Sequence, residues 1–252
     1  MHVVQGVDAL RPSVGPVFVV IGVFDGMHLG HAYLLDHLVS EARLRDAQPT
    51  VITFDHHPDE VLMGRAPALL LDPDERLERL EAAGVAVTVV QHFDTSLRET
   101  PYDRFIERIR DGVELSGFLM TPDAAFGFER RGTPATIAEL GARDGFDVVV
   151  VPPFTLDGEE VRSSAIRDAI VRGDLVTAAR LLGRPVTITG STGTAVDGRT
   201  RLGFSLPLAL PPDDDYPVTV EGSPETLRLS GGDAYLLGAP SNGRVTVVLG
   251  DA

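Results

Sequence analysis

Short unbroken runs of apolar residues alternate with longer amphipathic stretches through the first part of the chain. The run at residues 17–21 is rich in β-branched side chains and ends at Gly22, a pattern typical of a strand buried on both faces. From His31 to Arg45 the apolar side chains recur every three or four residues, which predicts a helix with one apolar stripe. The first two predicted elements are therefore a buried strand and an amphipathic helix.

The same alternation continues along the chain. We expect strands at residues 50–54, 85–91, 117–120 and 147–151, and further helices that begin near Asp72, Thr100 and Thr133. Strands that alternate with helices predict an α/β fold with a doubly wound, Rossmann-like parallel sheet. Ligands bind beyond the carboxyl ends of the strands in such sheets, so the loops that follow the strands should share one cleft. These loops start at Gly22, Asp55, Thr121 and Pro152.

The pattern changes after two expected helices between Ser163 and Gly183. Short β-type runs, such as residues 186–189 and 244–249, then lie among glycine, proline and threonine. We therefore predict an α/β domain over residues 1–184 and a small β-rich domain over residues 185–252. Within the second domain, the proline and aspartate residues at 211–215 predict an exposed loop.

Composition and charge exclude several classes of function. The 22 basic residues are all arginine and face 37 acidic ones, and a formal net charge of −15 opposes unspecific attraction to nucleic acid or anionic membranes. The absence of lysine disfavours a P-loop kinase, and the absence of cysteine excludes disulfides and thiolate metal sites. No apolar run of about 18 residues and no basic leader is present, so we expect a cytoplasmic protein without nucleic-acid or membrane partners.

The strongest chemical signal is the segment Gly-Val-Phe-Asp-Gly-Met-His-Leu-Gly-His at residues 22–31, between the first strand and the first helix. Its glycines permit close approach to a phosphate, and the helix start offers backbone N–H groups. His28 and His31, three residues apart, can reach the same anion. Taken alone, two histidines at this spacing more often cap a helix or bind a metal. Their setting here, however, resembles the signature of the nucleotidyltransferase superfamily. We therefore expect phosphate binding, and no metal held by this pair.

A second polar segment, Ser163-Ser164-Ala165-Ile166-Arg167, offers hydroxyl, backbone N–H and guanidinium donors at a helix start. On its own it is an ordinary helix start, but beside the first motif it predicts the other half of a triphosphate clamp. Two loops should face the same cleft. Phe54 and Phe126 can contact a planar ring there, and Arg130 or Arg131 can meet a phosphate, although such an arginine pair is as often solvated.

Together, residues 22–31, 53–58, 126–132, 163–167 and 181–185 resemble the bacterial bifunctional riboflavin kinase/FAD synthetase family, in the same order and over about residues 15–190. The resemblance implies an FMN adenylyltransferase that makes FAD and pyrophosphate from FMN and ATP with Mg²⁺, and no metal held by the protein. It implies an ATP site of Gly22, Phe24, Asp25, Gly26, His28, Gly30, His31, Ser163, Ser164 and Arg167, with His28, His31 and Arg167 catalytic. It implies an FMN site of Phe54, His57, Pro58, Asp123, Phe126 and Arg130.

The chain departs from the family pattern at several positions. His56 stands where the family typically has the first proline of Phe-Asp-Pro-His-Pro, Thr121 and Ala124 replace a glycine and a phenylalanine, and Arg162 replaces a serine. Two alternatives therefore stay open. One is a nucleotidyltransferase for another phosphorylated acceptor, and the other is a flavin or nucleotide sensor without turnover.

The second half departs further. The family's kinase domain is entered through Gly-Arg-x-Leu-Gly-Phe-Pro-Thr-Ala-Asn, whereas residues 198–208 carry Leu206 and Leu208 in place of polar residues. A leucine side chain neither coordinates Mg²⁺ nor donates to a phosphate. The residues after Arg184 are also too few for the family's usual barrel with its catalytic glutamate, as far as the sequence predicts. We expect riboflavin kinase activity to be absent.

Overall fold

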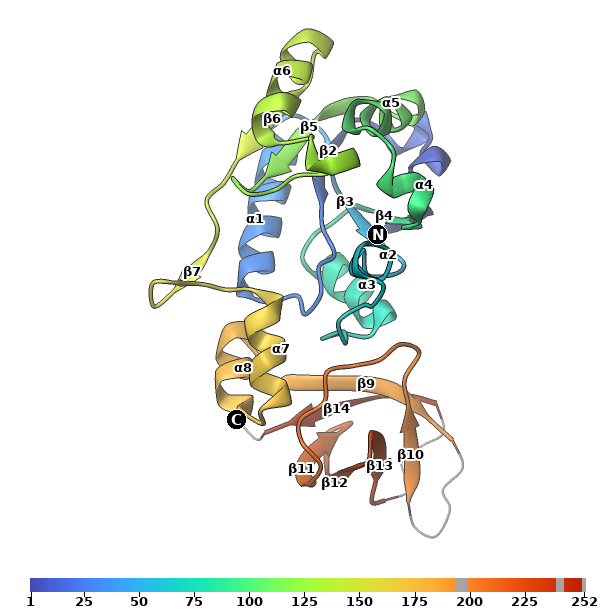
Figure 1. Cartoon of the computed structure of the whole chain (residues 1–252), viewed down its shortest axis with the longest axis vertical. Coiled ribbons are helices and arrows are strands. Elements are labelled where there is room, and N and C mark those ends of the chain that lie inside the picture. Colours follow the sequence, from blue (N-terminus) through green and yellow to red (C-terminus); the bar gives the residue numbers. More distant parts are fainter. Residues whose placement is uncertain (194–198, 239–242, 251–252) are drawn as a thin grey trace. The chain divides into compact units, whose positions relative to one another are not determined.

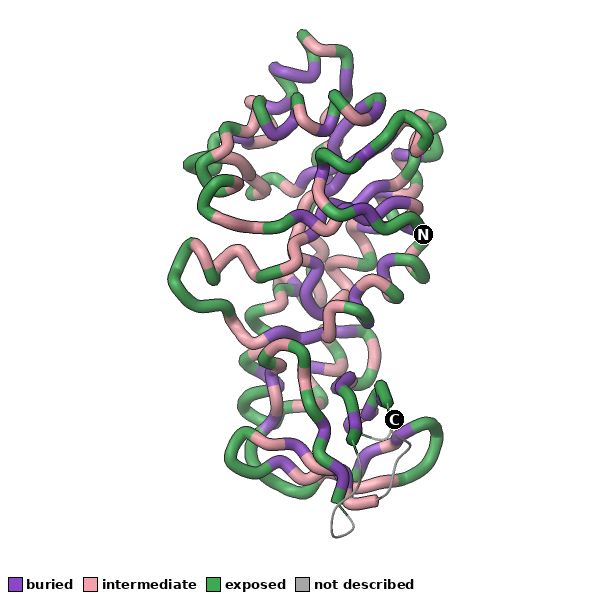
Figure 2. The backbone as a smooth tube through the Cα atoms, turned by 90° about the vertical axis from the view of Figure 1, so that its right-hand side faces the viewer, coloured by how far each residue is buried: buried purple, intermediate pink, exposed green. Residues whose placement is uncertain are grey.

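A computed structural model describes residues 1–193, 199–238 and 243–250 and groups the chain into two compact units (Figure 1). The first unit contains residues 1–24, 30–67 and 77–155, and the second contains residues 25–29, 68–76 and the chain from Leu156 onward. Figure 2 colours the backbone by burial, and buried stretches in purple alternate with exposed stretches in green along the chain.

The first unit is built on a six-stranded parallel sheet in the order β1-β4-β3-β2-β5-β6. The strands are β1 (His2–Gln5), β2 (Val17–Ile21), β3 (Gln48–Phe54), β4 (Val87–Gln91), β5 (Leu115–Met120) and β6 (Asp147–Val150). The predicted doubly wound sheet is confirmed. The chain order runs outward from β2 in both directions, so the loops after β2 and β5 diverge at a switch point, where such sheets bind ligands.

The strand predicted at residues 17–21 is present as β2, but the expectation that it is the first strand is wrong. The chain starts the sheet with β1, which pairs in parallel with β4 from His2 opposite Val87. Only Val4 of its four residues is buried. An edge strand with one buried side chain has no apolar run, so the pattern along the chain contains no signal for it.

The predicted helices are present, and α6 and α8 begin at side-chain caps. They are α1 (Leu29–Leu44), α3 (Pro73–Ala82), α5 (Tyr102–Gly112), α6 (Pro134–Asp144), α7 (Ser163–Val171) and α8 (Leu175–Leu182), with short α2 (Asp59–Met63) and α4 (Thr95–Arg98) in addition. Thr133 and Thr136 form a reciprocal capping box at α6, and Asp174 accepts a hydrogen bond from the N–H of Thr177 at α8. No helix of the described residues is long and apolar enough to cross a bilayer.

The second unit contains a closed antiparallel barrel in the order β10-β13-β12-β11-β14-β9. Its strands are β9 (Val186–Thr192), β10 (Thr200–Gly203), β11 (Asp215–Val220), β12 (Ser223–Ser230), β13 (Asp233–Leu236) and β14 (Gly243–Leu249); a separate hairpin is formed by β7 (Thr155–Leu156) and β8 (Glu159–Glu160). The predicted β-rich domain is confirmed, but the segment is not too short for a barrel. Two-residue turns at Glu221-Gly222 and Gly231-Gly232, all with positive φ, join three strands with little chain.

The predicted loop at residues 211–215 is exposed from Pro212 to Asp214, whereas Pro211 is buried and Asp215 already belongs to β11. The barrel begins at Val186, but α7 and α8 group with it in the second unit. The segment 68–76 belongs to this unit as well.

Candidate functional site

The first unit holds a cavity of about 570 Å³ at the carboxyl ends of the strands. Such a volume lies in the range of small-molecule sites. Mostly apolar residues line it, among them Gly22 and Val23 after β2, Phe54, His57 and Pro58 after β3, Phe93 and Leu97 after β4, and Met120, Ala124, Phe126 and Arg130 at β5 and after it. The expected loops that start at Gly22, Asp55 and Thr121 thus share one cavity. The loop at Pro152 contributes no residue to its lining, and the loop after β4, which the sequence analysis missed, does.

Aromatic rings form two walls of this cavity. Phe54 meets Phe93 edge to face, with ring centroids 5.3 Å apart. Phe126 packs on Phe118 and Phe105 at centroid distances of 5.8 and 6.0 Å. Phe54 is the last residue of β3 and Phe93 lies two residues after the end of β4, so both follow a buried strand closely, and this position was the available signal for Phe93. Flat apolar walls of this kind suit a planar aromatic ligand.

Five of the six residues expected at a flavin line this cavity, namely Phe54, His57, Pro58, Phe126 and Arg130. Asp123 is not among the lining residues. Its carboxylate accepts a hydrogen bond of 2.8 Å from the Thr121 hydroxyl, and its carbonyl oxygen accepts one of 3.2 Å from Arg130. Asp123 therefore braces the loop after β5.

The backbone of this loop is strained next to the cavity. Glu129 and Arg130 both have left-handed φ values, 54° and 55°. Non-glycine residues in this region cost about 1–3 kcal/mol each and occur preferentially at functional sites. The chain accepts this strain where it presents Arg130 to the cavity.

The motif at residues 22–31 is divided between the two units. In the first unit, Gly22 lines the cavity, and Phe24 is buried with a φ of 54°. The Phe24 ring contacts the imidazole of His31, with centroids 5.1 Å apart. Gly30 and His31 lie in the first turn of α1, where backbone N–H groups have no partner within the helix.

In the second unit, the structure brings Asp25, Ser163 and Arg167 together. The buried Asp25 carboxylate accepts hydrogen bonds from the N–H groups of Leu70 and Leu71, at 2.7 and 3.3 Å, and forms an ion pair of 2.8 Å with Arg167. The Ser163 hydroxyl donates to the Asp25 carbonyl oxygen at 2.8 Å. The two predicted halves of the clamp are therefore joined by direct contacts, while Ser164 is exposed in the first turn of α7.

His28 and Gly26 lie beside Arg184 in the same unit. The Arg184 guanidinium donates a hydrogen bond of 2.8 Å to the Gly26 carbonyl oxygen. The His28 side chain is buried, and burial, assisted by the positive charge of Arg184, lowers its pKa to about 4. His28 is therefore a neutral imidazole at pH 7, which offers an anion a hydrogen-bond donor rather than a positive charge.

Comparison with known proteins gives consistent relatives. The family profile of FAD synthetase matches residues 11–165. A bifunctional riboflavin kinase/FMN adenylyltransferase of Haemophilus influenzae is 34% identical over 192 residues, which cover 75% of this chain and 62% of that protein. Its counterpart in Escherichia coli strain K12 is 31% identical over 194 residues, with the same two coverages of 75% and 62%. The chain thus spans about three fifths of the length of these relatives.

A solved structure shares the fold of almost the whole chain. It is described as a macrolide-efflux protein from Streptococcus pneumoniae and aligns with a TM-score of 0.82, covering 99% of this chain and 98% of that one. Its sequence identity is 21%, so the likeness is one of fold alone.

Proposed function

The chain belongs to the FAD synthetase family, and on that premise we propose that it is an FMN adenylyltransferase, which transfers AMP from ATP to FMN and releases pyrophosphate. The observation that carries the proposal is the aromatic-walled cavity at the carboxyl ends of β2 to β5, in a chain that also carries the motif at residues 22–31. A planar tricyclic ring fits between walls of this kind. Arg130, exposed at the cavity, is suited to the anionic phosphate of FMN.

In the proposed reaction, an oxygen of the FMN phosphate attacks the α-phosphorus of ATP. The bond from the α-phosphorus to the bridging oxygen breaks, and the electron pair leaves with pyrophosphate. Catalysis then consists of positioning and of stabilising the negative charge that grows on the phosphates. We assign this role to His28 and His31, with Gly22, Phe24, Gly26 and Gly30 shaping the loop around the phosphates.

Ser163, Ser164 and Arg167 are assigned to the triphosphate. Arg167 already uses Nε for the Ala68 carbonyl oxygen, at 2.6 Å, and one terminal nitrogen for Asp25. These bonds fix its guanidinium plane and leave Nη1 outside them, so Nη1 is the donor that we assign to ATP. In this proposal Asp25 positions Arg167 rather than contacting the nucleotide.

We propose that ATP binds as its magnesium complex and that the phosphates of ATP hold the ion. Mg²⁺ prefers oxygen ligands in an octahedral arrangement. Among the described residues, the group with the spacing of metal ligands is Asp55, His56 and His92, and two imidazoles are poorly suited to Mg²⁺.

Riboflavin kinase activity is proposed to be absent. Leu206 and Leu208 replace polar residues of the family motif. Leu208 forms an isolated β-bridge with Leu69, and the N–H of Leu69 donates to the Pro207 carbonyl oxygen at 2.8 Å. This stretch therefore serves to hold the segment 68–76. Gly198, the first residue of the expected motif, lies outside the described residues.

Product analysis tests the proposal. The purified chain is incubated with ATP and Mg²⁺, once with FMN and once with riboflavin, and the flavins are separated by chromatography. FAD from FMN and no product from riboflavin is the expected result. FMN formed from riboflavin would refute the loss of kinase activity. No FAD from FMN, despite saturable FMN binding, would replace the proposal by another acceptor or by a sensor.

A further inference from the structure

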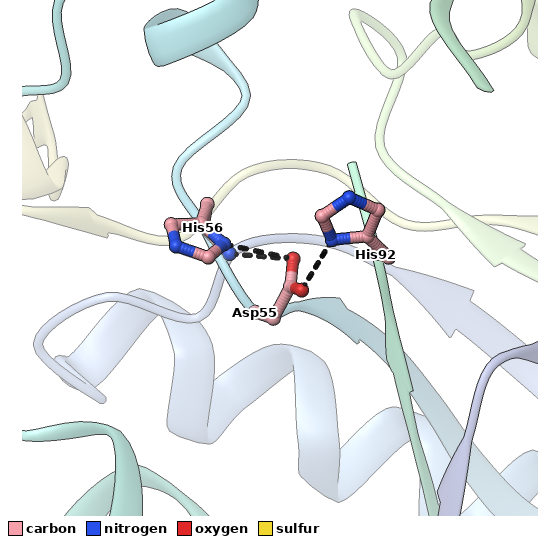
Figure 3. A group of neighbouring side chains, drawn as sticks. All are labelled: Asp55, His56 and His92. Atoms are coloured by element: carbon pink, nitrogen blue, oxygen red, sulfur yellow. Dashed lines mark hydrogen bonds and ion pairs between the residues drawn. The ribbon is translucent and has the colours of Figure 1, made fainter. Parts of the chain in front are cut away.

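A group of metal-ligand type lies where two neighbouring strands end (Figure 3). Asp55 directly follows β3, His92 directly follows β4, and His56 is the next residue after Asp55. The Nδ1 atom of His92 is 2.6 Å from one carboxylate oxygen of Asp55, and Nδ1 of His56 is 3.3 Å from the other. Figure 3 shows the two imidazoles on either side of the carboxylate, and the ligand atoms of the three residues lie within 4.8 Å of one another.

These donors suit a borderline-soft divalent ion. Two imidazole nitrogens and one carboxylate oxygen are ligands of Zn²⁺, and three protein ligands leave a fourth tetrahedral position open. Ligand atoms around a tetrahedral Zn²⁺ are roughly 3.3 Å apart, given metal–ligand distances of about 2.0 Å. Small side-chain adjustments therefore convert the observed group into a coordination shell. The three side chains are 32%, 45% and 64% exposed, for Asp55, His56 and His92 in turn, so an ion can enter from solvent.

The group is attached to the wall of the apolar cavity. Phe54 precedes Asp55, Phe93 follows His92, and the two rings are in edge contact at 5.3 Å. The N–H of Phe93 also donates to the Asp55 carboxylate at 3.3 Å. An ion bound here would tie the end of β3 to the end of β4 and fix the position of both rings.

We propose that Asp55, His56 and His92 bind one divalent transition-metal ion of the Zn²⁺ class, and that the ion sets the position of the Phe54–Phe93 wall. The first part concerns metal binding alone. The second part rests on the proposed function, because it predicts that the ion changes the affinity of this cavity for FMN.

The test uses the full chain, freed of metal with a chelator and titrated with Zn²⁺ by calorimetry in the absence of flavin. One ion per chain is expected. His56→Gln and His92→Gln should each weaken binding roughly tenfold or more, the loss that even supporting residues of metal sites produce. His2→Gln is the matched control, because His2 pairs with Val87 at the opposite end of β4. Equal Zn²⁺ binding by all four proteins, or none by the wild type, would overturn the proposal.

Co²⁺ supplies a readout that is independent of activity. The wild type and His2→Gln should develop visible absorption of a four-coordinate ion, and the His56 and His92 variants should not. In the flavin arm, FMN is titrated with and without Zn²⁺. If the FMN affinity is the same with and without Zn²⁺, the coupling to the cavity wall is refuted, and the metal site itself is still decided by the calorimetric result. If the chain binds no FMN at all, this result counts against the proposed function instead.

Discussion

Burial decides the charge of His28, a residue that the sequence analysis expects in a phosphate site. The imidazole is 5% exposed and its pKa lies at about 4, whereas the unfolded chain protonates it near 6.5. The folded state therefore takes up this proton only at lower pH than the unfolded state. It follows that His28 imposes no stability cost above pH 6.5, and that stability is lost as the pH falls from 6.5 towards 4.

The chain should thus lose about 2 kcal/mol of stability through His28 between pH 7 and pH 5. Urea unfolding at the two pH values measures the loss, and His28→Gln should show a loss smaller by about this amount. His2→Gln, which removes an exposed imidazole, should keep the wild-type difference. If His28→Gln retains the full pH dependence, His28 is not buried as a neutral group.

His31 tests the catalytic assignment at the same scale. Replacing it by alanine should lower kcat for FAD formation, because the transition state loses about 2–4 kcal/mol of stabilisation, a typical loss for one electrostatic donor. His37→Ala, six residues further along α1, is the control and should keep kcat. An unchanged kcat in His31→Ala, measured by pyrophosphate release, would remove His31 from the mechanism.

At the scale of elements, a glycine in the loop after β5 lies where a side chain would clash with the backbone of Tyr102. Gly127 has a φ of 76°, and a Cβ atom there would lie 2.5 Å from the backbone nitrogen of Tyr102. Gly64, at the end of α2, has nearly the same φ of 74° but open space around it. The two positions therefore separate backbone strain from a steric clash.

Gly64→Ala should cost about 1 kcal/mol through its positive φ. Gly127→Ala should cost roughly 1–3 kcal/mol more, because the clash with Tyr102 must be relieved by moving the loop. It should also weaken FMN binding, since the loop carries Phe126 and Arg130, whereas Gly64→Ala should not. Urea unfolding and FMN titration measure both effects, and equal destabilisation by the two variants would contradict the proposed clash.

At the scale of the whole molecule, hydrogen bonds link the barrel, through the segment 68–76, to Asp25 of the motif at residues 22–31. The segment 68–76 provides the N–H groups that hold Asp25, and the same segment is fastened to β9. The buried Glu75 carboxylate accepts hydrogen bonds from the hydroxyls of Thr187 and Thr189, at 3.1 and 2.6 Å. The barrel thus supports the segment that holds Asp25.

Thr189→Val should lower the free energy of unfolding by about 1.5–3 kcal/mol, because a buried charge loses its shorter hydrogen bond. Thr219→Val, at a half-buried position on β11 of the same barrel, should change stability by much less. Urea unfolding of the two variants gives the comparison. Equal small effects would show that Glu75 does not depend on the barrel.

The sequence by itself determined the elements whose buried face can be recognised from the local pattern of apolar residues. The β2 run, the apolar stripe of α1, helix α5 and the capped start of α6 appear where the pattern predicts them, because periodicity reports which face of a segment is buried. It also located the motif at residues 22–31 and the family, because both are carried by residue types at fixed spacing.

Only the tertiary structure decided which distant residues meet. It added β1 as an edge strand, brought Phe93 into the cavity, kept Asp123 out of its lining and closed the barrel. It turned Asp25 towards Leu70, Leu71 and Arg167, and it set the charge of His28. The physical reason is that pairing, desolvation and ion pairs depend on neighbours that are far away along the chain, and no local pattern records those neighbours.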